Sequence, residues 1–408
     1  MKKKRGLIYF LLVCFLLFLT SCGIQKNKVE LARGDVDISQ YSTDAFQIGY
    51  DTQTFHLGGS RISTAGPTGL YFMENDFLYY YDYISLQTYI VCSRANCKHN
   101  NYENCDAAFM LPEYYHDRIE YYDGSLYMLG YEASSKAVNL YQISEDGSTR
   151  KTVQTLFSLN DPNDLGLFVI HRGLIFYTMY EDWEHISLFK VDMNDGFKTE
   201  KIHTLEGRGY ITAIYGYNDS LYFQDWTVDR ETEKDGTTLY CYDFYKETTE
   251  RVILPREQMN FEIAGDTLCY LPLEAPDLLC LYDLKTGDEK KISLDYESWY
   301  VSYDGNYLYT TNWKFGEEIT DIDALVVDVF SLDGEHVDTI PIPNSEFVAF
   351  GDCNTLLVSF LERTDGDTYY LKRYDKKKIG TGDYSLDILY QRGMNAMPED
   401  GVIVVFGE

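Results

Sequence analysis

The feature that most constrains this chain is a ten-residue stretch, residues 121–130, because variants of it return along almost the whole sequence. Two hydrophobic, aromatic-rich runs flank the pair Asp123-Gly124. An Asp-Gly pair between such runs is a strong signal for a β-hairpin, because glycine accepts the positive φ that a tight turn needs. The stretch therefore predicts a hairpin that the chain repeats.

One aliphatic position of this hairpin can be followed through seven copies. Its equivalents are Leu78, Leu126, Ile175, Leu221, Leu268, Leu308 and Leu356. The intervals between them are 48, 49, 46, 47, 40 and 48 residues. A near-constant period of this size indicates an array in which each copy is one supersecondary unit.

Each copy contains four short runs with the composition of β-strands. In the second copy the runs are 119–122, a run from Leu126, 138–143 and 152–157, with a second turn at 145–148. The whole chain has 38 Tyr and 22 Phe against 9 Pro, which favours strands. Four strands at this period predict an all-β fold, a β-propeller of seven four-stranded blades. Six or eight blades are also compatible, because the fifth interval is short and the first copy is irregular.

The two ends of the repeat region bear on how such a ring closes. Residues 46–55 and 402–406 are strand-like and lie outside the seven copies. We expect one of these segments to complete a terminal blade, so that the two ends share it.

The first residues indicate an export signal rather than part of the fold. A basic run, Lys2 to Arg5, precedes an apolar run over 7–19, which is too short to span a bilayer comfortably. The sequence Leu19-Thr20-Ser21-Cys22 resembles the lipobox of bacterial lipoproteins. The resemblance implies diacylation of Cys22, including palmitate, and cleavage before it; a plain secretory signal or an uncleaved anchor is the alternative. We expect a signal peptide over 1–21, a lipid-anchored tether over 22–45 and the propeller domain over 46–408, on the extracytoplasmic face of the plasma membrane.

The charge of the chain excludes one class of partner. Removal of residues 1–21 takes away four basic and no acidic residues, which leaves 31 Lys and Arg against 65 Asp and Glu, a formal charge of −34. Nucleic acid is excluded as a partner, because binding it depends on neutralising phosphates with basic side chains. An anionic membrane surface would repel this charge, so the lipid on Cys22 is the expected link to the membrane.

A cluster of cysteines, which we name the cysteine box, interrupts the first copy. Cys92, Cys97, His99 and Cys105 fall within fourteen residues, where other copies have a two-residue turn. Three thiolates and one imidazole suit a closed tetrahedral Zn²⁺ site. The spacing C-x4-C-x-H-x5-C matches no standard zinc signature, and outside the membrane a disulfide between two of the three cysteines is the alternative. Both readings make the box structural.

The lipobox, the propeller repeat and the cysteine box together resemble a group of uncharacterised β-propeller lipoproteins of Gram-positive bacteria. The resemblance covers the whole chain, and its most specific part is the cysteine box. It implies location and fold, since the group carries no assigned activity.

Three tryptophans, Trp183, Trp226 and Trp313, fall in corresponding loops between the second and third strands. In a propeller these loops emerge on one face. Aromatic side chains beside Asp and Glu suit a sugar or peptide, through stacking and hydrogen bonds. The alternative is that each tryptophan packs over the edge of its own blade. We expect a binding or scaffolding module for a saccharide, peptide or protein, acting as a monomer.

Enzyme activity is not indicated by any motif of the chain. The sequence contains no H-E-x-x-H, no G-x-S-x-G and no phosphate-binding glycine loop. Paired carboxylates are frequent, but a chain this acidic places them in solvated loops. A secreted carbohydrate-active hydrolase or lyase, with its site on the loop face, is the alternative to a binding module, and it rests on fold analogy alone.

Overall fold

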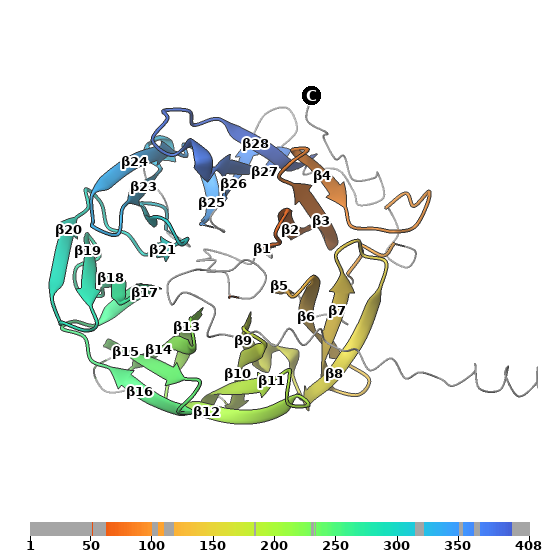
Figure 1. Cartoon of the computed structure of the whole chain (residues 1–408), viewed down its shortest axis with the longest axis horizontal. Helices are drawn as coiled ribbons and strands as arrows, with labels where there is room; N and C mark the ends of the chain where they lie inside the picture. Colours follow the sequence, from red (N-terminus) through yellow and green to blue (C-terminus); the bar gives the residue numbers. More distant parts are fainter. Residues whose placement is uncertain are drawn as a thin grey trace, which may run out of the picture. The chain divides into compact units, whose positions relative to one another are not determined.

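Aromatic-rich runs separated by tight turns form 28 β-strands in the described part of the computed structural model. The structure describes residues 51, 63–99, 105–109, 118–182, 185–229, 232, 234–314, 322–350, 354–362 and 368–393. The strands pair in sequence order into seven antiparallel sheets of four. Figure 1 shows these sheets as the blades of a ring, which confirms the predicted seven-bladed β-propeller.

The first four blades take up the first half of the repeat region. Blade 1 contains β1 (Ser63–Ala65), β2 (Gly69–Glu74), β3 (Phe77–Asp82) and β4 (Gln87–Ile90). Blade 2 contains β5 (Ile119–Tyr122), β6 (Ser125–Glu132), β7 (Ala137–Ser144) and β8 (Arg150–Ser158). Blade 3 contains β9 (Leu165–His171), β10 (Leu174–Asp182), β11 (His185–Asp192) and β12 (Lys198–Glu206). Blade 4 contains β13 (Gly209–Tyr217), β14 (Ser220–Val228), β15 (Asp235–Asp243) and β16 (Thr248–Val252).

The remaining three blades follow the same order. Blade 5 contains β17 (Gln258–Ala264), β18 (Thr267–Pro272), β19 (Leu278–Asp283) and β20 (Glu289–Ser293). Blade 6 contains β21 (Val301–Tyr303), β22 (Leu308–Thr311), β23 (Val326–Phe330) and β24 (His336–Pro341). Blade 7 contains β25 (Ser345–Ala349), β26 (Thr355–Glu362), β27 (Thr368–Asp375) and β28 (Leu386–Gly393). Three short 3₁₀ helices are η3 (Pro162–Asp164), η4 (Ile322–Ala324) and η5 (Lys376–Lys378).

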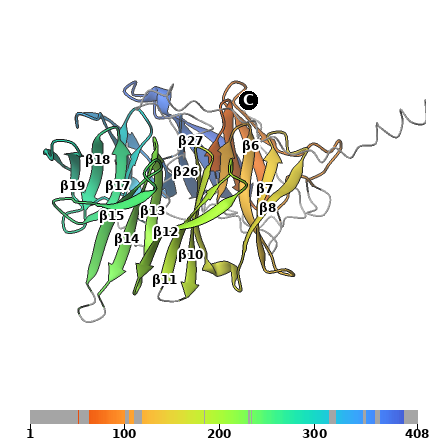
Figure 2. The ribbon, with the colours of Figure 1, turned by 60° about the horizontal axis from the view of Figure 1, so that its bottom comes forward.

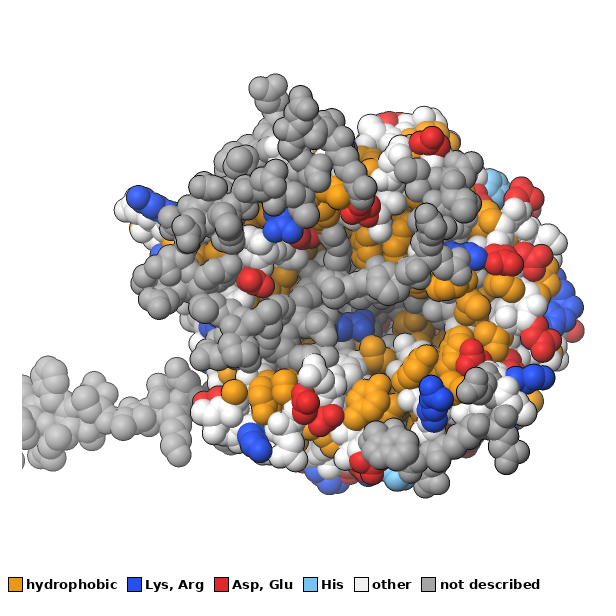
Figure 3. All heavy atoms as spheres, turned by 180° about the vertical axis from the view of Figure 1, so that it is seen from behind, with side chains coloured by type: hydrophobic (Ala, Val, Ile, Leu, Met, Phe, Trp, Pro, Cys, Tyr) orange, Lys and Arg blue, Asp and Glu red, His pale blue; other side chains and the backbone are white. Residues whose placement is uncertain are grey.

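The first strand of each blade lines the centre of the ring and the fourth lies at the rim (Figure 1). Figure 3 shows the ring from behind, with acidic and basic side chains along its outer edge. The turns after the first and third strands lie at one end of the ring, which we call the turn face. The connections after the second and fourth strands lie at the other end, the loop face. The hairpins β10–β11 and β14–β15 project beyond their neighbours on one side of the ring (Figure 2).

The core lies between neighbouring blades, and its buried aliphatic positions produce the repeat seen in the sequence. The aliphatic position of the second strand is 0% exposed in every blade, at Leu70, Leu126, Ile175, Leu221, Leu268, Leu308 and Leu356. A second position, on the third strand, is at most 2% exposed, at Leu78, Leu140, Leu188, Leu239, Leu279, Val327 and Leu371. Both series bury aliphatic groups between sheets, so both recur at the same period.

The alignment of the first copy was wrong by one strand. Leu78 lies on β3, the third strand of its blade, and the equivalent of Leu126 is Leu70 on β2. The two leucines open similar aromatic runs, so sequence alone did not separate them. The correct interval from Leu70 to Leu126 is 56 residues, because the connection between blades 1 and 2 is long.

The same shift corrects the position of the cysteine box. Its first cysteine follows β4, which is the fourth strand of blade 1 rather than the third. The box therefore belongs to the connection between blades 1 and 2. It does not replace a turn within a blade.

The described strands show how the two terminal blades meet, while the predicted closing segments are largely outside the described residues. Both terminal blades are built from four consecutive strands, so among the described residues neither blade takes a strand from the other end of the chain. Of the two segments predicted to do so, only Asp51 lies within the described residues. Side chains join blades 7 and 1 instead. Thr88 donates to the carbonyl of Leu389 at 2.8 Å, and the rings of Tyr79 and Tyr390 lie 5.3 Å apart.

Candidate metal centre and ligand face

The cysteine box occupies the loop that leaves β4. Cys92 follows the strand directly, and a hydrogen bond of 3.3 Å from the backbone N–H of Cys97 to the carbonyl of Arg94 turns the chain back. Asn96 and His99 have φ values of 63° and 52°. Positive φ is uncommon for residues other than glycine, so the backbone bends sharply at both positions. These bends bring three side chains of a short segment to one place.

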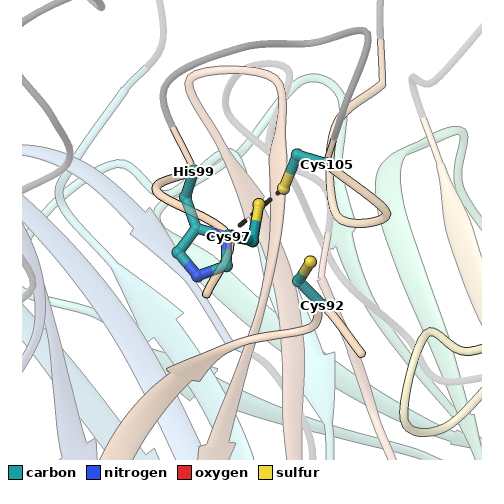
Figure 4. A group of neighbouring side chains, drawn as sticks. All are labelled: Cys92, Cys97, His99 and Cys105. Atoms are coloured by element: carbon teal, nitrogen blue, oxygen red, sulfur yellow. Dashed lines mark hydrogen bonds between the residues drawn. The ribbon is translucent and has the colours of Figure 1, made fainter. Parts of the chain in front are cut away.

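The four predicted ligands converge, as Figure 4 shows. The sulfur atoms of Cys92, Cys97 and Cys105 and one ring nitrogen of His99 all lie within 4.8 Å of one another. The closest recorded pair is His99 Nδ1 and Cys105 Sγ, 3.3 Å apart. A tetrahedral Zn²⁺ with Zn–S bonds of about 2.3 Å separates its sulfur ligands by roughly 3.8 Å. The cluster therefore has the composition of a zinc site, and its ligand atoms lie close enough together to hold a metal ion.

The protonation of the cluster is unequal. Burial raises the pKa of the Cys105 thiol to about 12. Burial acts in the same direction on Cys92, but hydrogen bonds from the backbone amides of Arg94 and Asp106 and from the other two thiols outweigh it, so the pKa of Cys92 lies below its ordinary value. Burial lowers the pKa of His99, which favours its neutral form. Metal binding needs a neutral imidazole and thiolates, so the pKa shifts of His99 and Cys92 favour it and the shift of Cys105 opposes it.

The box is tied to both of the blades that it connects. Within the connection, Asp106 accepts hydrogen bonds from Ser93 at 2.9 Å and from Arg94 at 2.6 Å. On the side of blade 1, Leu78 on β3 donates its N–H to the carbonyl of Ala107 at 2.9 Å. Arg150, at the start of β8 in blade 2, donates to the carbonyl oxygens of Asp106 and Ala108, and its guanidinium lies 3.9 Å from the centre of the Phe109 ring. A site held from both sides can connect two blades that share no strand.

The sequence identified the four ligands but not the arginine that supports them. Arg150 is 45 residues away from Cys105 in the sequence, and no motif links the two. The contact follows only from the fold, which places β8 next to the connection between blades 1 and 2.

The three predicted ligand-binding tryptophans have different surroundings. Trp183 lies outside the described residues. Trp313 is only 3% exposed and packs between Tyr300 and Phe347, with ring centres 5.9 and 6.0 Å away. The prediction of an exposed aromatic ring is therefore wrong for Trp313, because the loop after β22 folds this side chain into the core.

Trp226 is half-buried and lies on β14, in one of the projecting hairpins. Its partner across the antiparallel pair with β13 is Tyr210, which is 47% exposed. Directly paired residues share one face of a sheet, so both side chains project from the same face. Asp229 and Asp235, at the end of the same hairpin, are exposed. The sequence analysis missed Tyr210. Tyr210 precedes the apolar Ile211 in a strand, and because successive side chains of a strand point to opposite faces, the two could have been placed on opposite faces.

Two buried polar pairs were also missed. Glu120 on β5 is 4% exposed and bonds Arg118 at 2.8 Å. His203 Nε2 lies 2.8 Å from Oδ2 of Asp225, which is 4% exposed. In both cases the partners are recognisable only once the strands are placed.

The remaining predicted positions give less information. Cys241, Cys269 and Cys280 are free thiols in strands, while Cys22 and Cys353 lie outside the described residues. Among the residues that the structure describes, no helix has the length and hydrophobicity needed to cross a membrane.

Comparisons with known proteins support the fold alone. No protein-family model and no curated protein sequence matches this chain. A solved structure from a study of two prolyl endopeptidases is similar, with 12% identity, a TM-score of 0.53, and coverage of 86% of this chain and 51% of that one. An uncharacterized protein of Listeria monocytogenes EGD-e shares 12% identity over 65% of this chain and 79% of its own length, with a TM-score of 0.44. An oligogalacturonate lyase in complex with manganese shares 11% identity over 61% and 72%, also with a TM-score of 0.44.

This chain spans about half of the matched prolyl endopeptidase chain. At such low identity the likeness extends to the propeller architecture and not to residues of a site.

Proposed function

We propose that this chain is a lipid-anchored binding module of the outer face of the plasma membrane, and that its propeller binds a saccharide. The observation that carries the proposal is Trp226 on the projecting hairpin β14–β15, paired across the sheet with the exposed Tyr210 of β13. Aromatic rings stack on the flat faces of sugar rings. The exposed carboxylates of Asp229 and Asp235 are acceptors for sugar hydroxyls.

The test is a glycan array followed by titration of one ligand against two variants. Trp226→Ala is expected to weaken binding roughly tenfold or more, a loss above about 1.4 kcal/mol, because it removes the central ring of the site. Trp313→Phe is the matched control, since Trp313 is buried away from solvent. Equal affinity of wild type and Trp226→Ala for a confirmed ligand would reject this site. A peptide that competes for the site would replace the saccharide, and turnover of the ligand would favour the hydrolase or lyase.

The anchor is proposed on the sequence pattern that ends at Cys22. Cys22→Ala is expected to abolish lipid labelling of the protein. Persistent labelling in that variant would refute the lipobox assignment.

We propose further that the cysteine box holds a structural Zn²⁺. Its support is the convergence of three sulfur atoms and one nitrogen within 4.8 Å, with no place for a water ligand in a set of four. A closed site of this kind stabilises the fold, because the unfolded chain does not present the ligands together.

Replacement of one ligand tests the zinc site. Cys97→Ser is expected to lose the bound zinc and to melt at a lower temperature, by several degrees, than wild type. Cys241→Ser, which alters a cysteine of β15 outside the box, is the control and is expected to keep the zinc. Zinc-free wild-type protein in which two of the three cysteines are oxidised to a disulfide would contradict the proposal.

A further inference from the structure

The turn between β3 and β4 presents two large apolar side chains to solvent. Ile84 is 84% exposed, the highest value among the large hydrophobic residues that the structure describes, and Leu86 is 52% exposed. We call these two residues the apolar tip. Single exposed hydrophobic residues are common, but two on one turn form a small surface that lacks an apolar partner within the described residues.

The turn holds the apolar tip in a fixed conformation. Asp82 Oδ1 accepts the backbone N–H of Ile84 at 2.8 Å, and Asp82 Oδ2 accepts the hydroxyl of Ser85 at 3.0 Å. Leu86 donates its N–H to the carbonyl of Asp82 at 2.9 Å and has a φ of 56°. This φ is unfavourable for a leucine. The exposure is therefore built into the turn rather than produced by a loose loop.

Other blades make the same turn with other residues. Asp192, Asp243 and Asp283 each accept the backbone N–H two positions on, as Asp82 does. The residues at that exposed position are Asn194, Tyr245 and Lys285. At the position of Leu86 they have Gly196, Glu247 and Gly287, all with positive φ. The turn itself does not need an apolar pair. Tyr245 of blade 4 is also exposed, at 67%, but none of these three blades has large hydrophobic residues at both positions.

One described residue upstream of blade 1 lies on the same face. Asp51 accepts a hydrogen bond of 2.7 Å from Nε of Arg172. Arg172 lies in the turn between β9 and β10 and also binds Asp219, at 3.0 Å, in the turn between β13 and β14. Turns after the first strand of a blade lie on the turn face, as does the turn after β3. Asp51 and the apolar tip therefore share one face.

A basic run lies on the blade next to the apolar tip. Blade 7 adjoins blade 1, where the hydroxyls of Tyr83 and Thr355 lie 3.0 Å apart. The turn after β27 carries three consecutive lysines. Lys376 is buried and paired with Asp304, and Lys378 is paired with Asp383, whereas the side chain of Lys377 is exposed. An exposed lysine on the neighbouring blade suits the interface of a bilayer, where phosphates lie next to hydrocarbon.

We propose that the turn face is apposed to the lipid bilayer and that Ile84 and Leu86 insert into its interface. This inference rests on the proposed lipid anchor and extends it, because a lipid on Cys22 alone would not orient the propeller. It places the ligand face, with Trp226 and Tyr210, away from the membrane.

Depth-dependent quenching of tryptophan fluorescence tests the proposal on the full-length acylated protein. The protein is reconstituted in phosphatidylcholine and phosphatidylglycerol vesicles with and without 5-doxyl lipid. Ile84→Trp places a reporter at the tip, and Ile253→Trp is the control, because Ile253 is 70% exposed and follows β16 at the loop face. The native tryptophans contribute equally to both variants. We expect roughly twofold greater quenching of Ile84→Trp, together with a blue shift on vesicle binding.

The outcomes separate this inference from the proposed anchor. Protein that floats with vesicles but shows no more quenching of Ile84→Trp than of Ile253→Trp would overturn the inference and leave the anchor intact. Protein that does not float with vesicles would contradict both. A blue shift without quenching by doxyl lipid would show that the tip contacts another protein, such as a second copy, and would also overturn the inference.

Discussion

Glu120 is a charged residue in an unusual place, on the innermost strand β5 and 4% exposed. Burial raises the pKa of its carboxyl to about 7, against the opposing effect of Arg118. A carboxyl with a raised pKa in the folded state binds its proton more tightly there than in the unfolded chain. It therefore contributes stability that is fully present below its ordinary pKa and is lost as the pH rises toward 7.

We expect Glu120→Gln to become more stable relative to wild type as the pH rises from about 4.5 to about 7, by up to about 3 kcal/mol. Denaturant unfolding at several pH values measures this difference. Glu250→Gln, at an exposed position of β16, supplies the baseline. A difference that stays constant over this range, or that falls as the pH rises, would contradict the assignment.

At the scale of single residues, the sequence predicted which residues form the cysteine box better than it predicted how exposed a side chain is. Spacing was enough to select the four residues of the cysteine box, because all of them lie within fourteen positions of one another. Exposure was harder to predict. Trp226 lies near the end of a second strand and Trp313 follows one. Trp226 is half-buried, whereas Trp313 is packed in the core. The difference comes from how each loop folds back, which depends on contacts distant in sequence.

At the scale of elements, strand β8 links blade 2 to the cysteine box through Arg150. The guanidinium donates to two carbonyl oxygens of the segment that follows Cys105. Groups that hold metal ligands in place commonly change metal affinity by about 10- to 100-fold when they are removed. The strand therefore supports the site without contributing a ligand to it.

We expect Arg150→Ala to weaken zinc binding by roughly 10- to 100-fold, while the ligand set stays complete. Competition with a fluorescent zinc chelator measures the affinity. Lys198→Ala is the control, because Lys198 opens the fourth strand of blade 3 as Arg150 opens that of blade 2, and its side chain is 62% exposed. An affinity of Arg150→Ala equal to that of Lys198→Ala would show that the arginine only packs against Phe109.

The period of the repeat predicted the strands of the blades, but it assigned Leu78 of the first copy to the wrong strand. Leu70 and Leu78 are both buried aliphatic residues at the start of aromatic runs. Periodicity could not choose between them, because a long connection follows this blade and no other. The choice depends on β1, whose three residues are too few to give a periodic signal.

At the scale of the whole molecule, the described residues join the two ends of the ring through side chains between complete blades. A cluster of buried residues extends through blades 6, 7 and 1, and includes Tyr309, Tyr374 and Tyr79. Tyr369 also reaches across to Glu74 at 3.1 Å. The number of blades followed from the sequence, whereas the segments predicted to close the ring lie outside the described residues, apart from Asp51.

The cysteine box has a matching role at the next junction. Blades 1 and 2 are joined by a long connection, and the proposed Zn²⁺ would fix that connection between them. Both junctions of blade 1 are therefore reinforced, one by aromatic packing and the other by the proposed metal. The zinc site is the central claim of this account.

X-ray absorption at the zinc edge, on full-length protein purified without added metal or chelator, tests that claim most directly. The account predicts one zinc per chain, with three sulfur ligands at about 2.3 Å and one nitrogen at about 2.0 Å. Protein without zinc that contains a disulfide among Cys92, Cys97 and Cys105, or a zinc with oxygen ligands only, would contradict it.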